Sequence, residues 1–310
     1  MKKRLRLGCG LSMLLILCAP PFCAAQKIAI TFDDLPLNGE LPPGVTRVEI
    51  AKDTLAILKK WHIPPAYGFI NAKRLEDSQD SADALKLWAS AEPVGNHTYS
   101  HLDLNQNTTQ AFEREIAENE PVLELLDPSS GEWRWLRYPF LREGDTLEKR
   151  NAVRDYLKSR GYKVAQVTME WGDYFWNTAY ARCAAKNDAK GMDWLRTSYL
   201  STESAEIDHY RELSKIVFDR DINYVLLLHL GSFSGTILPE AFALLKKKGL
   251  QFVTLQEAEN DAAYAIDPSE GALNGGTFLD QLMNTRKLTY PSSSISMPQK
   301  PEKELAEICR

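Results

Sequence analysis

Short apolar runs alternate with amphipathic stretches along most of the chain. The runs at residues 27–32, 66–70, 133–137, 163–168, 223–228 and 251–254, with a shorter one around Val94, are typical of buried β-strands. Stretches with an apolar face at helical spacing lie at residues 47–61, 81–89, 110–126, 146–160 and 239–248. This alternation indicates βαβ units and a parallel sheet. Over this length it predicts an α/β fold built as a distorted (β/α) barrel.

Polar residues follow several of these predicted strands. They are Asp33, Asp34, His97, Arg137, Asp173 and His229, each at the C-terminal end of a strand or in the loop after it. Catalytic residues of parallel barrels gather at that edge. The pattern therefore predicts an active site there.

The first 25 residues have the pattern of a secretory signal peptide. Four Lys or Arg residues among the first six precede an apolar run at 7–18, which is too short to span a bilayer. Small residues at 23–25 form a cleavage site before Gln26. We expect a periplasmic or secreted protein with no stable membrane span after cleavage. An uncleaved membrane anchor is the alternative.

Cleavage changes the charge and the cysteine content. It leaves 33 basic against 42 acidic residues, a net charge of −9, with no basic stripe, which argues against a nucleic-acid partner. Cys183 and Cys309 are the two cysteines that remain, so at most one intramolecular disulfide is possible. The remaining 285 residues suffice for one large core.

These features divide the chain into a signal peptide (1–25), a catalytic domain (26–258) and a C-terminal extension (259–310). The extension contains many Gly, Ser and Pro residues, and we expect it to pack on the barrel or to be partly flexible. Its part beyond Pro291 is expected to be dispensable for chemistry. The long segment at 176–204 is a candidate lid or substrate-shaping element.

Taken singly, the candidate residues have ordinary structural explanations. Asp33-Asp34 after a strand is common in turns and helix caps, and Arg137 could end a strand at the surface. His229 closes an apolar strand and needs a polar partner if it is buried. A core histidine with a satisfied hydrogen bond remains the alternative there.

The histidines carry a stronger signal because the chain has few of them. His97 and His101 are four residues apart, so on a helical turn they would share one face and could bind one ion. His62 follows a predicted helix and His209 lies in a charged helix, and both are expected at the surface.

Together, the order and spacing of these residues resemble the five motifs of the polysaccharide deacetylase family, the NodB-homology fold or carbohydrate esterase family 4. The similar segments are Thr31-Phe32-Asp33-Asp34, His97-Thr98-Tyr99-Ser100-His101, Arg137-Tyr138-Pro139-Phe140, Glu170-Trp171-Gly172-Asp173-Tyr174 and Leu226-Leu227-Leu228-His229. The resemblance extends over residues 27–257.

The resemblance implies one divalent metal ion bound by Asp34, His97 and His101, with Zn²⁺ expected first and Co²⁺, Mn²⁺ or Ni²⁺ as alternatives. Two histidines and one aspartate leave coordination positions open, as in catalytic zinc sites.

The resemblance also implies the catalytic roles. Asp33 would be the general base, oriented by Arg137. His229 would be the general acid, positioned by Asp173. The backbone N–H of Phe140 would donate to the oxyanion.

Some positions depart from the family pattern. Phe140 replaces a tyrosine, and Leu141 stands where a glycine is expected. Glu170 and Tyr174 replace an aspartate and a tryptophan. These changes leave the chemistry intact, but the shape of the substrate groove does not follow from the motifs.

The expected function is that of a metal-dependent hydrolase that removes acetyl groups, N-acetyl first, from an acetylated carbohydrate. One alternative is a metal-dependent amidase that acts on a non-carbohydrate C–N bond. The other is a non-catalytic carbohydrate-binding relative, which predicts loss of the acid, the base or the metal ligands. All of these roles have a suitable residue here.

Overall fold

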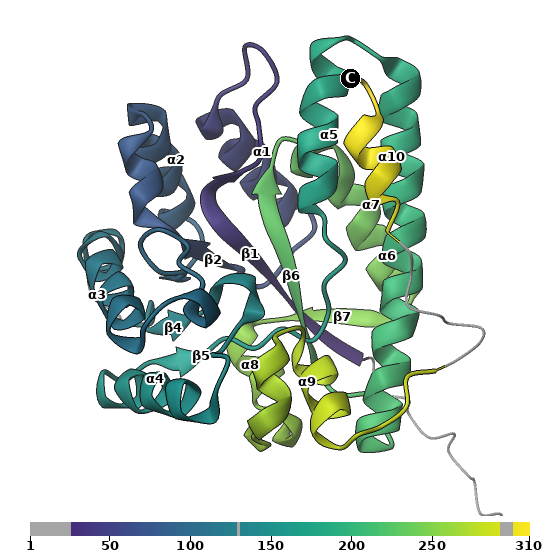
Figure 1. Cartoon of the computed structure of the whole chain (residues 1–310). Coiled ribbons are helices and arrows are strands. Elements are labelled where there is room, and N and C mark those ends of the chain that lie inside the picture. The colour runs from purple at the N-terminus through teal and green to yellow at the C-terminus, as the bar shows by residue number, and fades with distance from the viewer. Residues whose placement is uncertain (1–25, 129–130, 292–299) are drawn as a thin grey trace, which may run out of the picture.

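A parallel β-sheet forms the centre of the protein in the computed structural model (Figure 1). The structure describes residues 26–128, 131–291 and 300–310, so the predicted signal peptide lies outside the described residues. The strands are β1 (Gln26–Asn38), β2 (Tyr67–Ile70), β3 (Val94–Asn96), β4 (Trp135–Leu136), β5 (Lys163–Val164), β6 (Tyr224–Gly231) and β7 (Leu250–Val253).

The sheet curls into an incomplete barrel. Its strand order is β5-β4-β3-β2-β1-β6, and β7 pairs with the first residues of β1. All pairs are parallel. Met169, beyond β5, forms an isolated bridge with Leu226 of β6, which brings the two ends of the sheet together. The predicted distorted (β/α) barrel is confirmed.

Helices surround this sheet, with α2 to α4 on one side and α5, α6 and α10 on another (Figure 1). The α-helices are α1 (Arg47–Lys60), α2 (Gln79–Ala89), α3 (Thr109–Leu126), α4 (Leu147–Ser159), α5 (Tyr174–Ala185), α6 (Ala189–Phe218), α7 (Ser234–Lys247), α8 (Leu255–Glu259), α9 (Phe278–Thr285) and α10 (Glu302–Glu307). Short 3₁₀ helices are η1 (Ala72–Glu76), η2 (Leu104–Gln106), η3 (Pro139–Leu141), η4 (Ala262–Ala265) and η5 (Ser269–Asn274). Among the described residues, no helix is both long and apolar enough to cross a bilayer.

The pleat of the central strands separates two cores. Ile28, Ile30 and Phe32 of β1 belong to the large core shared with the helices. Ala29 belongs to a smaller core with Phe69, Trp135 and Val225 inside the barrel. Since successive side chains of a strand face opposite sides, Thr31 and Asp33 continue this inner series. The barrel interior is therefore apolar toward the N-terminal ends of the strands and polar at their C-terminal ends.

The segment at 176–204 forms part of this core instead of a lid. It contains most of α5 and the first half of α6, with Trp176, Leu195 and Tyr199 fully buried. The expectation that His209 lies at the surface is also wrong, because its side chain is 2% exposed on the inner face of α6. His62 is exposed, as expected.

The C-terminal extension packs on the barrel wherever it is described. Helix α9 contacts α6, and α10 contacts α5. A disulfide joins Cys183 of α5 to Cys309. Residues 292–299, which belong to the part predicted to be dispensable, lie outside the described residues.

Candidate active site

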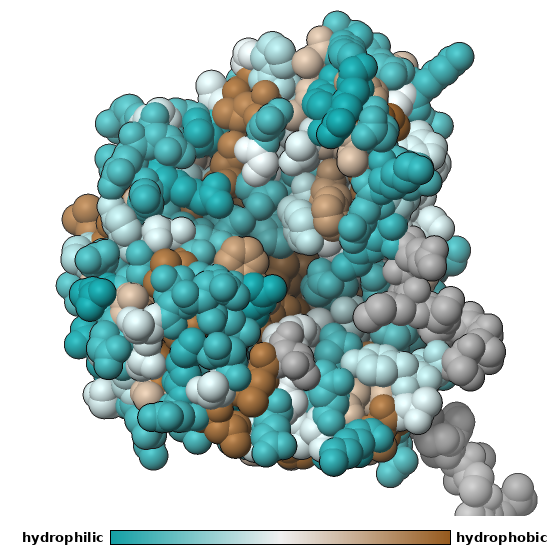
Figure 2. Space-filling model, in the orientation of Figure 1, coloured by the Kyte–Doolittle hydropathy of each residue, from teal (hydrophilic) through white to brown (hydrophobic). Residues whose placement is uncertain are grey.

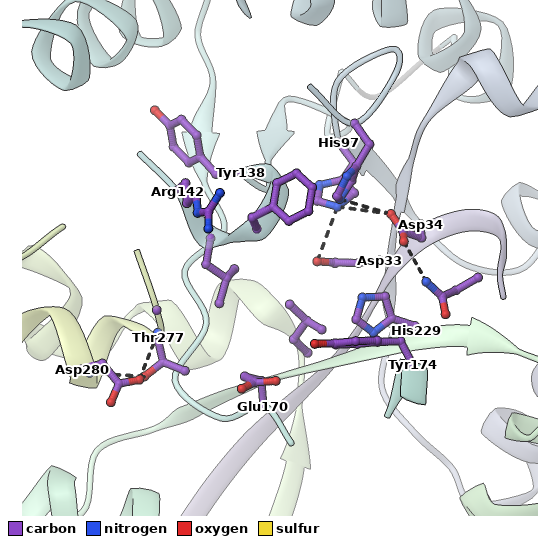
Figure 3. Close-up of a pocket in the computed structure, with 16 residues that line it drawn as sticks. Asp33, Asp34, His97, Tyr138, Arg142, Glu170, Tyr174, His229, Thr277 and Asp280 are labelled. Atoms are coloured by element: carbon purple, nitrogen blue, oxygen red, sulfur yellow. Dashed lines mark hydrogen bonds and ion pairs between the residues drawn. The ribbon is translucent and has the colours of Figure 1, made fainter. Parts of the chain in front are cut away.

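A cavity of about 450 Å³ opens at the C-terminal edge of the barrel. It lies in a part of the molecule whose surface is hollowed between hydrophilic flanks (Figure 2). Six of the predicted site residues line it: Asp33, Asp34, His97, His101, Phe140 and His229. Arg137 and Asp173 lie behind this lining and contact it, so the structure brings all eight together. Asp33, Asp34, His97 and His229 lie close to one another in the cavity (Figure 3).

Asp33 and His229 face each other because their strands pair in register. β1 and β6 run parallel with Asp33 beside His229, so the two side chains share the inner face of the sheet. Arg137 completes this arrangement from the end of β4. Its Nη1 donates to both oxygens of Asp33, at 2.9 and 3.1 Å, and its Nε donates to the carbonyl oxygen of Ala165 at 2.9 Å.

Two opposing effects act on the pKa of the buried Asp33 carboxylate. Burial raises its pKa above the ordinary value, and the Arg137 guanidinium works in the opposite direction. A raised pKa suits a group that must accept a proton.

Asp34 reaches the same cavity through an unusual backbone turn. The strand predicted at residues 27–32 ends before this point, but β1 continues to Asn38. Instead, Asp34 has φ 63°, and the register of β1 shifts across this residue in its pairing with β2 and in its pairing with β6. This turn brings its carboxylate back to the face that Asp33 occupies. Its Oδ2 accepts a hydrogen bond from Asn38 Nδ2 at 2.9 Å and lies 3.4 Å from Arg74 Nη2.

His97 and His101 meet in a loop and not on a helical turn, so that expectation is wrong. The loop follows β3 and contains two left-handed residues, Thr98 (φ 64°) and His101 (φ 62°). The two rings are 4.8 Å apart. His97 Nδ1–H donates to the carbonyl oxygen of Arg137 at 2.8 Å, which leaves its Nε2 directed at Asp34.

These three side chains fit a metal ion. Asp34 Oδ1 is buried without a hydrogen-bond partner, and it lies 3.6 Å from His97 Nε2 and 3.5 Å from His101 Nε2. One ligand atom from each residue lies within 4.8 Å of the others. Burial lowers the pKa of both histidines to about 4, so both are neutral at pH 7, as metal ligands must be.

On the opposite side of the cavity, Asp173 holds His229 at two points. One Asp173 oxygen accepts the backbone N–H of His229 and the other accepts its Nδ1–H, both at 2.7 Å. Burial disfavours the imidazolium, but the Asp173 carboxylate outweighs it and raises the pKa of His229 to about 9. Both ring nitrogens are therefore protonated at neutral pH. Nδ1–H is bonded to Asp173, so Nε2–H is available to a substrate in the cavity.

Phe140 sits in a strained loop beside the metal ligands. Phe140 (φ 58°) and Leu141 (φ 53°) are both left-handed, a conformation that favours glycine. Leu141 occupies the position where the family pattern has glycine, and it adopts the glycine-like backbone nevertheless. The Phe140 ring is 55% exposed and contacts His101 edge-on at 4.5 Å.

Sequence reasoning missed part of the cavity lining. Asn38 and Arg74 hold Asp34, and no motif marks either of them. Thr277 and Asp280 line the cavity from the start of α9, where Asp280 accepts hydrogen bonds from the Thr277 backbone and hydroxyl. The Thr-x-x-Asp spacing predicts a helix cap, but nothing in the sequence places that cap beside the barrel.

The two substituted residues of the fourth motif also line the cavity. Glu170 accepts the backbone N–H of Gly172, and Tyr174 is 40% exposed with its ring 5.3 Å from that of His229. Both positions therefore belong to the cavity wall.

Comparison with protein-family models gives a match to the polysaccharide deacetylase model over residues 24–165. This range holds the Asp-His-His cluster, Arg137 and Phe140, and it ends before Asp173 and His229. No curated protein matches the chain.

Solved structures show the same fold. A chitin deacetylase from the fungal pathogen Colletotrichum lindemuthianum has a TM-score of 0.51 and 20% identity, with 77% of this chain and 90% of that chain covered. A CE4 family pseudoenzyme from Bacillus anthracis has a TM-score of 0.50 and 16% identity, with coverage of 76% and 66%. The presence of a pseudoenzyme means that the fold alone does not establish catalysis. The family match over residues 24–165 and the shared fold confirm the resemblance seen in the motifs: this part of the chain matches the polysaccharide deacetylase family, and the barrel has the NodB-type fold.

Proposed function

We propose that this protein is a metal-dependent hydrolase that removes N-acetyl groups from a carbohydrate. The observation that carries the proposal is the pairing of a base and a protonated acid across one cavity, beside an Asp-His-His cluster. Asp33 and His229 are register partners on adjacent strands, and Asp34 Oδ1 faces two neutral histidines.

Asp34, His97 and His101 would hold the metal ion, with Zn²⁺ favoured by the ligand set. When bound, such an ion polarises the acyl carbonyl and favours ionisation of water. The remaining chemistry belongs to the side chains and backbone around the cavity.

Asp33 takes a proton from a water molecule as the water oxygen attacks the acetyl carbon. Arg137 keeps the carboxylate oriented through two hydrogen bonds. The backbone N–H of Phe140 donates to the oxygen that gains negative charge. His229 then transfers its proton to the leaving nitrogen as the C–N bond breaks, so that acetate and a free amine are the products.

The protonated state of His229 favours an amide over an ester substrate. An amine is a poor leaving group unless it is protonated, whereas an alkoxide or phenoxide needs less help. With its pKa raised to about 9, His229 is protonated at neutral pH and can supply that proton.

The decisive experiment measures acetate release from acetylated chitooligosaccharides, peptidoglycan and acetylxylan. We expect release from an N-acetylated substrate, one free amine per acetate, with loss of activity on chelation and recovery on adding Zn²⁺. Turnover of simple amides without carbohydrate turnover would instead favour the amidase alternative. Tight carbohydrate binding without acetate release would favour the non-catalytic alternative.

We also propose that the protein acts in the periplasm or outside the cell. The support is the signal-peptide pattern of residues 1–25, and a polymeric acetylated carbohydrate would be met in the same compartment. Expression of the full chain followed by N-terminal sequencing of the exported protein tests this, with Gln26 expected as the first residue.

A further inference from the structure

The C-terminal helix α10 is anchored to α5, more than 100 residues earlier in the chain. The Cys183–Cys309 disulfide spans 126 residues. Arg182 adds hydrogen bonds to the carbonyl oxygens of Leu305 and Ile308 at 2.6 and 3.3 Å, and Leu305 itself is buried. In Figure 1 the segment lies against α5 and α6. It is therefore fixed in place wherever it is described.

Just before α10, Lys300 contacts the wall of the active-site cavity. Its Nζ donates to Glu170 Oε1 at 2.9 Å and lies 4.0 Å from Glu206 Oε1. Its side chain also packs over Gly172, where a Cβ would lie 3.3 Å from both Cδ and Nζ of the lysine. Lys300 thus contacts the segment 170–172 in two ways, through an ion pair with Glu170 and through van der Waals packing over Gly172.

That segment leads directly to the acid pair. The second oxygen of Glu170, Oε2, accepts the backbone N–H of Gly172 at 2.9 Å. Gly172 is left-handed (φ 69°), and the next residue is Asp173, which holds His229. A shift of Glu170 or Gly172 would therefore move the carboxylate that orients the proton donor.

Lys300 also balances charge at this point. Glu170 and Glu206 both face its ammonium group, and Tyr174 lies nearby. Without the lysine, the carboxyl groups of Glu170 and Glu206 would lose the cation that faces them. Hydration of the Glu170 carboxylate would then compete with its hydrogen bond to Gly172.

We propose that Lys300 is a positioning residue for proton donation: from the disulfide-anchored C-terminal segment it fixes the Glu170–Gly172 turn, and through it the Asp173–His229 pair. This inference rests on the proposed function. It also reverses the expectation that the chain beyond Pro291 is dispensable for chemistry.

The test uses the full mature protein with Lys300→Met, Lys300→Arg and, as matched control, Lys303→Met, which alters an exposed lysine of α10. Each variant is assayed on an N-acetylated chitooligosaccharide and on para-nitrophenyl acetate, whose phenolate leaves without a proton. For Lys300→Met we expect kcat on the amide to fall about tenfold with KM little changed, as for loss of a supporting hydrogen-bond partner. Turnover of the activated ester should be nearly unchanged, Lys300→Arg should recover most of the loss, and Lys303→Met should behave as wild type.

Amide hydrogen exchange of residues 170–175 supplies a readout that needs no activity. It should be faster in Lys300→Met than in wild type and in the Lys303 control. Equal loss on both substrates, unchanged amide turnover, or unchanged exchange in Lys300→Met would overturn the inference. If wild type releases acetate from no carbohydrate, the proposed function fails, and the exchange measurement still decides the role of Lys300.

Discussion

At Asp34 a single backbone dihedral decides which side of β1 the carboxylate faces. A regular strand would place Asp33 and Asp34 on opposite sides, and the left-handed turn at Asp34 places both in the cavity. The two adjacent carboxylates then have different surroundings. Arg137 holds Asp33, whereas Asp34 faces two imidazoles. One is thereby suited to proton transfer and the other to metal binding.

Replacing His101 by Ala should remove most of the bound metal, because it deletes one of three protein ligands. Elemental analysis of the wild type should give about one zinc or similar ion per chain. His62→Ala, at an exposed histidine, is the matched control and should keep its metal. Full metal content in His101→Ala and in His97→Ala would refute the assignment.

His229→Ala should keep the metal and lose about 10² to 10⁴ in kcat, the usual worth of a positioned acid. Because the pKa of His229 is raised to about 9, the imidazolium is present below that pH and is lost as the pH rises through it. The wild-type rate should therefore fall above about pH 9, and the variant should lack this alkaline limb. A large drop in melting temperature would instead indicate that His229 serves mainly the core.

Asp33→Asn should reduce kcat by about 10² to 10⁴ with the metal retained. It should also lower the melting temperature, since Arg137 would remain buried without its counter-ion, at a cost of roughly 3–5 kcal/mol. Combining Asp33→Asn with Arg137→Met separates the two effects. Stability should return in part, while activity should not, and recovery of activity would show that Asp33 is not the base.

At the scale of secondary-structure elements, periodicity predicted the barrel because buried parallel strands are short and apolar whatever surrounds them. The site residues were found because parallel strands end at one edge, as β1 and β6 do with Asp33 and His229. The spacing of His97 and His101 predicts a helical turn, whereas they lie in a loop, because spacing alone does not reveal left-handed residues.

Long-range packing explains the other misses. His209 lies among charged residues in sequence, yet α6 turns it toward the core. Thr277 and Asp280 line the cavity only because α9 folds back onto α6. Sequence patterns report local periodicity, and these placements depend on contacts between distant segments.

The Cys183–Cys309 disulfide should contribute to stability because it closes a long loop. Replacing Cys309 by Ser should cost roughly 2–4 kcal/mol and lower the melting temperature by several degrees. Reductant should lower the melting temperature of the wild type but leave that of the variant unchanged. If reductant affects both equally, or neither, the bond does not stabilise the folded protein.

Over the whole molecule, acidic charge predominates, and several carboxylates belong to the cavity lining. Asp33, Asp34, Glu170 and Asp280 lie there, with Arg142 and the imidazolium of His229 as the basic counterparts. Arg142 is itself paired with Asp103. A neutral substrate, or one that already carries free amines, therefore meets less electrostatic opposition than a polyanion.

The left-handed residues around the cavity predict how the protein would respond to selection. Asp34, His101, Phe140 and Leu141 each occupy a backbone conformation that costs a side-chain-bearing residue roughly 1–2 kcal/mol. A library randomised at these four positions and selected only for heat resistance should enrich glycine or asparagine. The same library selected for acetate release should keep Asp34 and His101 while still admitting glycine at Leu141. Deep sequencing of both pools checks this, and loss of Asp34 or His101 from the pool selected for acetate release would show that catalysis does not require them.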